Sequence, residues 1–563
     1  MHPLLLLPPA LVVALSLDQG GFDPSTWVWS GALAAWAAAT GAVTARELRL
    51  SRVALAWLAS ACAVLSCIAF SWLWSDRRAQ TLLELRRTAV YAAAVLALVV
   101  LVRRANGRHL LVSTHGAITA VVVYALARYL TETRAFDTFE GTLLAQPLGY
   151  ANALGALAAV GIVLGIGLAA QAPAALERAA AAASAPVLVT ALLLTSSRGA
   201  AVALAIGLVT TVACADDAAP LLGTALLVAP GSAIAAIVAA TSHLSDGNAK
   251  PYEHAAFVVG AAAAACTIGT AIAAAHVSPA TRSQRTLRRT LVAALAIGVI
   301  AAGVAAGLTE PRRSLWGVAW HQFEANIPFG SGAGTFALAW ARSGLIETRG
   351  GALDAHSLYL ETLAELGLVG LVLVFVFLAL PLTYARRAPV AAGAYVVVLV
   401  HAGLDWDWEM PAVMLAGLCC GAVALAQGAG EPRPVITTRG RAVVVVVALV
   451  LGAASIAGAR SSSEPGVVRP RSVAVVLGAR VAGLPVPVTL PMLRLRSRLG
   501  RAGRERVAVA EVRLQRAVRH GDLHPRVLLR VRAMADLNAV LLARRPVLTA
   551  RRAVLAARGL VLM

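Results

Sequence analysis

Long apolar runs recur through the first 460 residues, and they restrict the possible folds of this chain more than any other feature. A helix needs about 20 apolar residues to cross a bilayer, and only internally hydrogen-bonded elements are stable there. The fold class predicted from these runs is an all-α polytopic transmembrane helical bundle of about 12–15 spans. We expect them at 3–17, 27–45, 53–75, 88–102, 109–130, 149–170, 182–196, 199–214, 219–241, 255–277, 290–308, 363–384, 390–404, 411–427 and 442–459.

The composition excludes an ordinary soluble protein. Only 14% of the 563 residues are charged and 59% are hydrophobic, whereas soluble domains carry roughly 25% charged residues. The first run, Leu4 to Leu17, lacks a basic leader and an evident cleavage site, so we interpret it as a span and not as a signal peptide.

The charge distribution divides the chain into four regions. Residues 461–563 hold 20 arginines and 5 acidic residues. This tail therefore carries +15 of the chain's net charge of +21. This basic tail reads as Ala/Leu/Arg helices resembling tetratricopeptide-like modules, or alternatively as a surface for anionic lipid or polymer. The predicted regions are N-terminal spans (1–130), a catalytic membrane core (131–430, with a large extracytoplasmic loop at 309–362), a last span (431–460) and the tail.

The orientation follows from the arginines and lysines in the short loops. With the N-terminus inside, the cytoplasmic loops carry 16 of them and the opposite loops carry 11. Because positive loops stay in the cytoplasm, we expect the segment 309–371 and the tail to lie on the outer side of the plasma (inner) membrane.

The segment 309–371 is the longest stretch that lipid cannot bury. It begins with Arg312 and Arg313, and Trp316 lies one helical turn after Arg312. A glycine-rich turn at 330–334 can present backbone N–H groups to an anion.

One histidine, His356, stands later in the same segment between Asp354 and Tyr359. An amphipathic run containing Glu361 follows it and leads into the next span. A hydrogen-bonded structural role is the alternative for this histidine.

Polar residues also stand at the predicted outer ends of other spans. Arg198 occupies a tight hairpin, where an ionisable group is a functional candidate and contact with lipid phosphate is the alternative. Asn152 begins a span as a cap or an interfacial residue. The sequence HAGLDWDWEMP at 401–411 contains His401, Asp405 and two further carboxylates, which either balance outer arginines or take part in catalysis.

No metal or cofactor site is predicted. All six cysteines fall inside apolar runs, where cysteine behaves as a small hydrophobic residue. C-x-x-C and H-E-x-x-H spacings do not occur.

These motifs together resemble the O-antigen ligase family, which also includes O-antigen polymerases and protein O-oligosaccharyltransferases. The resemblance covers roughly residues 145–415, and the motifs stand in the family's order. They are TSSRGA, R-x-x-x-W at 312–316, IPFGSGAGTF, AHSLYLETLAELGLVGL, and H-x-x-x-D at 401–405 with Pro411.

The resemblance implies a membrane glycosyltransferase that uses a polyprenyl-diphosphate donor without a metal. His356 is similar to the family's essential loop histidine, and Arg198 and Arg312 are similar to the arginines that hold the donor diphosphate. Arg313 is adjacent and can substitute. Ser357 stands where the family often has asparagine. The predicted supporting residues are Asn152, Trp316, Asp354, Tyr359, Glu361, His401 and Asp405.

Elementary chemistry agrees with this prediction. Guanidinium groups stabilise the charge of a departing diphosphate, and an unperturbed histidine is the side chain suited to take a proton near neutral pH. The expected partners are the lipid-linked donor, a glycan, lipid or protein acceptor, and membrane lipids, but no nucleic acid.

Three alternatives remain. The first is a polymerase of the same family, which shares donor and chemistry. The second is a transporter of the lipid-linked glycan, although the charges gather at one face and inverted repeats are not apparent. The third is a docking protein that uses its tail.

Overall fold

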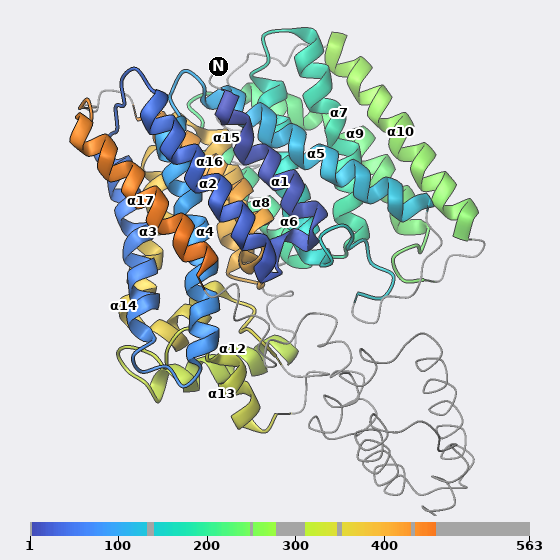
Figure 1. The fold of residues 1–563 in the computed structure, drawn as a ribbon. Coiled ribbons are helices and arrows are strands. Elements are labelled where there is room, and N and C mark those ends of the chain that lie inside the picture. Colours follow the sequence, from blue (N-terminus) through green and yellow to red (C-terminus); the bar gives the residue numbers. More distant parts are fainter. Residues whose placement is uncertain are drawn as a thin grey trace, which may run out of the picture. The chain divides into compact units, whose positions relative to one another are not determined.

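The computed structural model describes residues 3–131, 140–247, 252–276, 310–345, 352–428 and 434–457. These residues fold almost entirely into helices, and the isolated bridge between Arg49 and Val435 is the extended pairing found among them (Figure 1). The helices on apolar runs are α1 (Leu7–Leu17), α2 (Pro24–Thr44), α3 (Arg52–Ser71), α4 (Arg78–Leu101), α5 (Gly107–Thr131), α6 (Ala151–Ala170), α7 (Ala175–Leu194), α8 (Arg198–Cys214), α9 (Ala219–Thr241), α10 (Tyr252–His276), α14 (Leu358–Ala379), α15 (Pro389–Ala402), α16 (Pro411–Ala426) and α17 (Thr438–Ile456).

The predicted spans in the described regions coincide with these helices, apart from shifts of several residues at some ends. The expected span 290–308 and the predicted helices of the tail 461–563 lie outside the described residues. Local capping explains several boundaries. The side chains of Asp23 and Ser51, for example, accept hydrogen bonds from backbone N–H groups at the starts of α2 and α3.

Length and composition identify the molecule as a multi-pass membrane protein. Within the described regions, eight helices are long and apolar enough to span a bilayer. Shorter apolar helices cover Pro3–Leu17, Arg198–Cys214, Pro389–Ala402 and Pro411–Ala426. The expected all-α polytopic bundle is therefore confirmed.

Helix α6 is the central element of the bundle. It is buried along almost its whole length and packs against α5, α7, α8, α9, α15 and α16. Small residues permit such close packing, which is best seen where α8 crosses α15. A Cβ atom added to Gly393 would lie 1.8 Å from the Thr211 hydroxyl oxygen, so only glycine fits there.

A small subdomain lies at one end of the bundle. It contains α12 (Glu310–Glu324), α13 (Phe336–Ser343) and the start of α14, and its apolar core includes Leu315, Phe336, Trp340 and Ala355. Because α14 continues into the bundle, this subdomain is attached directly to the end where α6 and α8 begin and α15 ends (Figure 1).

Candidate functional site

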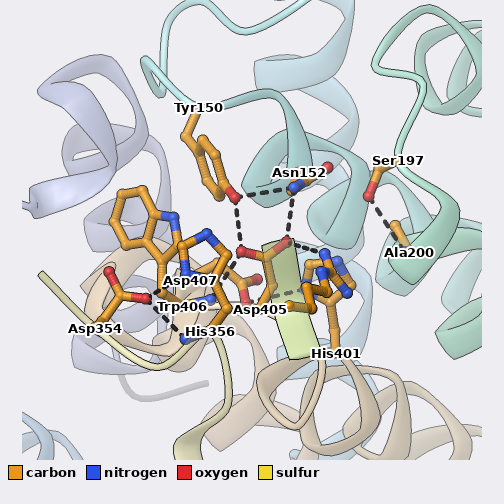
Figure 2. Close-up of polar contacts among 11 residues, drawn as sticks. Tyr150, Asn152, Ser197, Ala200, Asp354, His356, His401, Asp405, Trp406 and Asp407 are labelled. Atoms are coloured by element: carbon orange, nitrogen blue, oxygen red, sulfur yellow. Dashed lines mark hydrogen bonds and ion pairs between the residues drawn. The ribbon is translucent and has the colours of Figure 1, made fainter. Parts of the chain in front are cut away.

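A buried carboxylate, Asp405, joins three distant parts of the chain (Figure 2). It lies in the turn between α15 and the short 3-10 helix η4 (Asp407–Glu409). One oxygen accepts hydrogen bonds from the Tyr150 hydroxyl at 2.6 Å and from the Trp406 backbone N–H at 2.8 Å. The other accepts from the Asn152 amide at 2.7 Å and pairs with the Arg312 guanidinium at 3.2 Å.

These partners make Asp405 a holding group for Arg312. Burial and the nearby Asp405 carboxylate raise the pKa of Tyr150 well above its ordinary value, so its hydroxyl stays protonated and donates. Buried carboxylates require such partners to remain charged. The sequence alone predicted Arg312, Asn152 and Asp405 as separate candidates, and the fold brings them together.

A second acid, Asp354, orients His356. The backbone of His356 is in the left-handed region, with φ of 51°, which is uncommon for residues other than glycine. One oxygen of Asp354 accepts the His356 backbone N–H at 2.9 Å and lies 2.7 Å from the ring Nδ1. Because Nδ1 faces Asp354, the other ring nitrogen, Nε2, remains to meet a substrate.

The electrostatics of His356 connect it to the first cluster. Burial lowers its pKa, but the Asp354 carboxylate outweighs burial and raises the pKa to about 9. The charge of Asp405 acts in the same direction, and that of Arg312 opposes it. At neutral pH the resting site therefore carries an imidazolium near a guanidinium, an arrangement suited to polyanions.

A further acid and histidine pair lies deeper. His401 and Asp407 are almost completely buried, with His401 Nδ1 2.9 Å from an Asp407 oxygen. The opposite ring nitrogen lies against the start of α8, since a Cβ added to Gly199 would be 3.3 Å from it. Arg198 immediately precedes this glycine, and its side chain is exposed at the same end of the bundle. Ser197 caps the helix there (Figure 2).

Acidic residues of α14 hold the two loops of the subdomain. The Glu361 carboxylate accepts the Ala355 backbone N–H at 2.8 Å, next to His356. Glu365 accepts from Gly334 at 2.7 Å and from Phe336 at 2.8 Å. The Gly334 N–H, at the end of the glycine-rich turn that we considered as an anion site, is therefore bonded to a carboxylate of the chain itself.

Three predicted residues lie apart from the hydrogen-bonded cluster. The Tyr359 hydroxyl donates to the Leu399 carbonyl at 2.8 Å, and its ring stacks on Phe375 at 5.2 Å, so it joins α14 to α15. Trp316 packs on the subdomain core, and its indole N–H has no hydrogen bond within the described part of the chain. Arg313 is exposed and has no ion pair with any described residue.

Sequence reasoning missed the role of Arg87. This arginine of α4 is buried, pairs with Glu84 and, at 2.9 Å, with Glu409, and lies 4.7 Å from the Trp408 ring centre. Each carboxylate of the 401–411 segment thus has its own cationic or imidazole partner. The sequence did offer a signal for Arg87, because an arginine next to an apolar run is a functional candidate. The run does not show, however, which face of the helix packs against other helices and which faces lipid.

Across the described ranges, no group of three or more His, Cys, Asp and Glu side chains has an arrangement that could hold a metal ion. Near Asp405, the groups able to bind an anion include Arg312 and the protonated His356, and Arg198 and Arg313 are exposed at the same end of the bundle.

Comparison with protein families places part of the chain. Residues 179–375 match the model of a family described as O-antigen ligase. The matched segment contains Arg198, Arg312 and His356, whereas Asn152 and Asp405 lie outside it. No curated protein matches the chain.

Proposed function

We propose that this chain, which belongs to the O-antigen ligase family, transfers a glycan from a polyprenyl-diphosphate carrier to an acceptor at the outer face of the plasma membrane. One observation supports the proposal most strongly. A buried carboxylate, Asp405, holds the Arg312 guanidinium at the bundle end where Asp354 orients His356. This combination provides fixed positive charge for a diphosphate and an oriented imidazole for an alcohol.

The proposed reaction is a displacement at the anomeric carbon of the donor sugar. The acceptor hydroxyl oxygen forms a bond to that carbon, while the bond from the carbon to the diphosphate oxygen breaks. The diphosphate leaves on its carrier with the electron pair of the broken bond. The hydroxyl proton passes to Nε2 of His356 in its neutral form, which is the minor form at neutral pH because of the raised pKa. Asp354 stabilises the resulting positive charge across the ring.

The arginines are assigned to the leaving group. Negative charge grows on the bridging oxygen as the bond breaks, and a guanidinium binds two diphosphate oxygens at once with a permanent charge. Arg312 is pre-positioned by Asp405, and Arg198 and Arg313 offer exposed guanidiniums at the same bundle end. We propose that this charge makes a metal unnecessary, so that a chelator leaves the rate unchanged.

The decisive experiment is transfer of a labelled lipid-diphosphate glycan by the purified chain in proteoliposomes. His356→Ala is expected to abolish transfer, because the base is lost, while insertion stays intact. His321→Ala is the matched control, since His321 is exposed on α12 and, among the described residues, pairs with nearby Glu324. Normal transfer by the His356→Ala variant would remove the proposed base.

A second pair of variants tests the arginines. Arg198→Lys is expected to lower transfer, because lysine keeps the charge but loses the two-pronged geometry. Arg342→Lys is the control, as Arg342 is exposed and its ion pair within the described part of the chain is a long one, 3.5 Å to Asp76. Equal activity of the two variants would contradict a bidentate role for Arg198.

Ligase and polymerase share this chemistry and differ in the acceptor. Surface glycans of a deletion strain distinguish them. Free polymer retained on the carrier identifies a ligase, and single repeat units identify a polymerase.

A further inference from the structure

The end of the bundle opposite the candidate site contains a cavity of about 490 Å³. Its place follows from α6, which begins beside Asp405 and ends next to Gln171 in the cavity wall. The 20 residues of this helix span about 30 Å, so the two sites are a bilayer thickness apart. The volume lies within the range of about 300–1,000 Å³ typical of small-ligand sites.

Charged side chains of both signs line this cavity. The basic side chains are Arg104, Arg386 and Arg387, and the acidic ones are Asp216 and Asp217. Among the described residues, neither Arg104 nor Arg386 forms an ion pair with either aspartate. A cavity that Arg386 and Asp216 both line without pairing with each other can hold a ligand bearing both signs.

The helix ends add to this pattern. Arg386 and Arg387 directly precede the N-terminus of α15, where backbone N–H groups favour an anion. Asp216 lies just beyond the C-terminus of α8, and the C-termini of α6 and α16 also reach the wall; their carbonyls favour a cation.

The two aspartates are not equivalent. One oxygen of Asp217 accepts the Ala219 backbone N–H at 2.9 Å, which caps the start of α9. Asp216 is exposed and has no such bond to a described residue. Asp216 is therefore the acid available to a ligand.

We propose that this cavity binds the headgroup of an aminophospholipid such as phosphatidylethanolamine. The phosphate lies at Arg386, Arg387 and the α15 N-terminus, and the ammonium lies at Asp216 and the α8 C-terminus. A lipid is favoured over a soluble ligand because the cavity adjoins the ends of the apolar helices α6 and α9, at the depth of the headgroups. With the candidate site facing outward, the bound lipid belongs to the cytoplasmic leaflet.

Native mass spectrometry of the full chain, with added phosphatidylethanolamine or phosphatidylglycerol, tests this proposal. Arg386→Ala and Asp216→Asn are each expected to weaken phosphatidylethanolamine binding about tenfold, as for a lost charged hydrogen bond. Asp216→Asn is also expected to strengthen phosphatidylglycerol binding, because it removes a negative charge facing the phosphate. Arg52→Ala is the matched control, since Arg52 is exposed at the same bundle end outside the cavity.

Several results would overturn the proposal. Equal weakening by Arg52→Ala would show a diffuse surface charge effect, and unchanged phosphatidylethanolamine binding by Asp216→Asn would remove the amine subsite. Soluble phosphoethanolamine or inorganic phosphate binding as tightly as the lipid would identify a soluble anion site instead. Arg104→Ala provides a second basic variant if Arg386→Ala melts at a lower temperature than the parent.

Discussion

The substitution Asp354→Asn tests the proposed base most directly, because it removes one charge and preserves the side-chain shape. Asp354 lies 2.7 Å from Nδ1 of His356, and the pKa of that histidine is raised from 6.5 to about 9. Without the carboxylate, burial lowers the pKa by more than the charge of Asp405 raises it, and the charge of Arg312 lowers it further. We therefore expect it to fall to 6.5 or below.

The size of the effect follows from the two pKa values. A difference of about 2.5 units corresponds to about 3 kcal/mol between the protonated and neutral forms, an upper value because 30% of the side chain is exposed. At pH 7 the neutral fraction of His356 is about 1% in the parent and about 75% in the variant.

The assay is the pH dependence of kcat/KM for glycan transfer, which reports the free enzyme. For a base with a raised pKa, activity is lost as pH falls below that pKa. In the parent, kcat/KM is expected to rise about tenfold per pH unit from pH 6 toward 9. In Asp354→Asn the rise should end near pH 6.5, at a lower plateau because the base is weaker.

Asp354→Glu serves as the control, because it keeps a carboxylate near the ring and should keep the inflection well above 6.5. A parent profile that is flat between pH 6.5 and 8, or an inflection that Asp354→Asn does not move, would refute the role of His356 as the base.

Other predictions concern the groups that support the site. Asp405→Asn removes the counter-ion of Arg312 and should lower transfer about 100-fold, because the guanidinium is then misplaced. The helical circular dichroism should be unchanged, and a loss of transfer below twofold would contradict the holding role. Gly367→Ala places a Cβ 1.9 Å from the Pro328 carbonyl oxygen at φ of 66°, and should lower stability by at least about 3 kcal/mol in thermal melts. Gly317→Ala, with nothing within 4 Å, should be neutral or stabilising, and similar melts for the two variants would refute the argument. Arg87→Met leaves two buried carboxylates unpaired and should destabilise the folded chain by about 3–5 kcal/mol. The measurement is the loss of folded protein on heating in detergent, and an unchanged melt would show that the ion pairs contribute no stability.

The helices were predictable from the sequence because the signal for a span is local. A run of about 20 apolar residues must form a helix in lipid whatever its neighbours are, and α6 and α9 coincide closely with the predicted 149–170 and 219–241. The pairing of His356 with Asp354 is also a short-range feature, two residues apart in the chain.

The glycine-rich turn shows where local reasoning fails. Its N–H groups were candidates for binding an anion from outside, but the N–H of Gly334 donates to a carboxylate of the chain itself. That carboxylate belongs to Glu365, about thirty residues later in the chain. A side chain that remote competes for the same donors only after α14 has packed against the turn.

The sequence by itself determined the class of protein, the helices and the residue types able to act on a diphosphate, because hydrophobicity and charge belong to each residue wherever it lies. Tertiary structure alone decided that Asp405 joins Tyr150, Asn152 and Arg312, and that Arg87 is buried with Glu409. These contacts link residues 93 to 322 positions apart, and helix packing sets such distances, not the composition of any one segment.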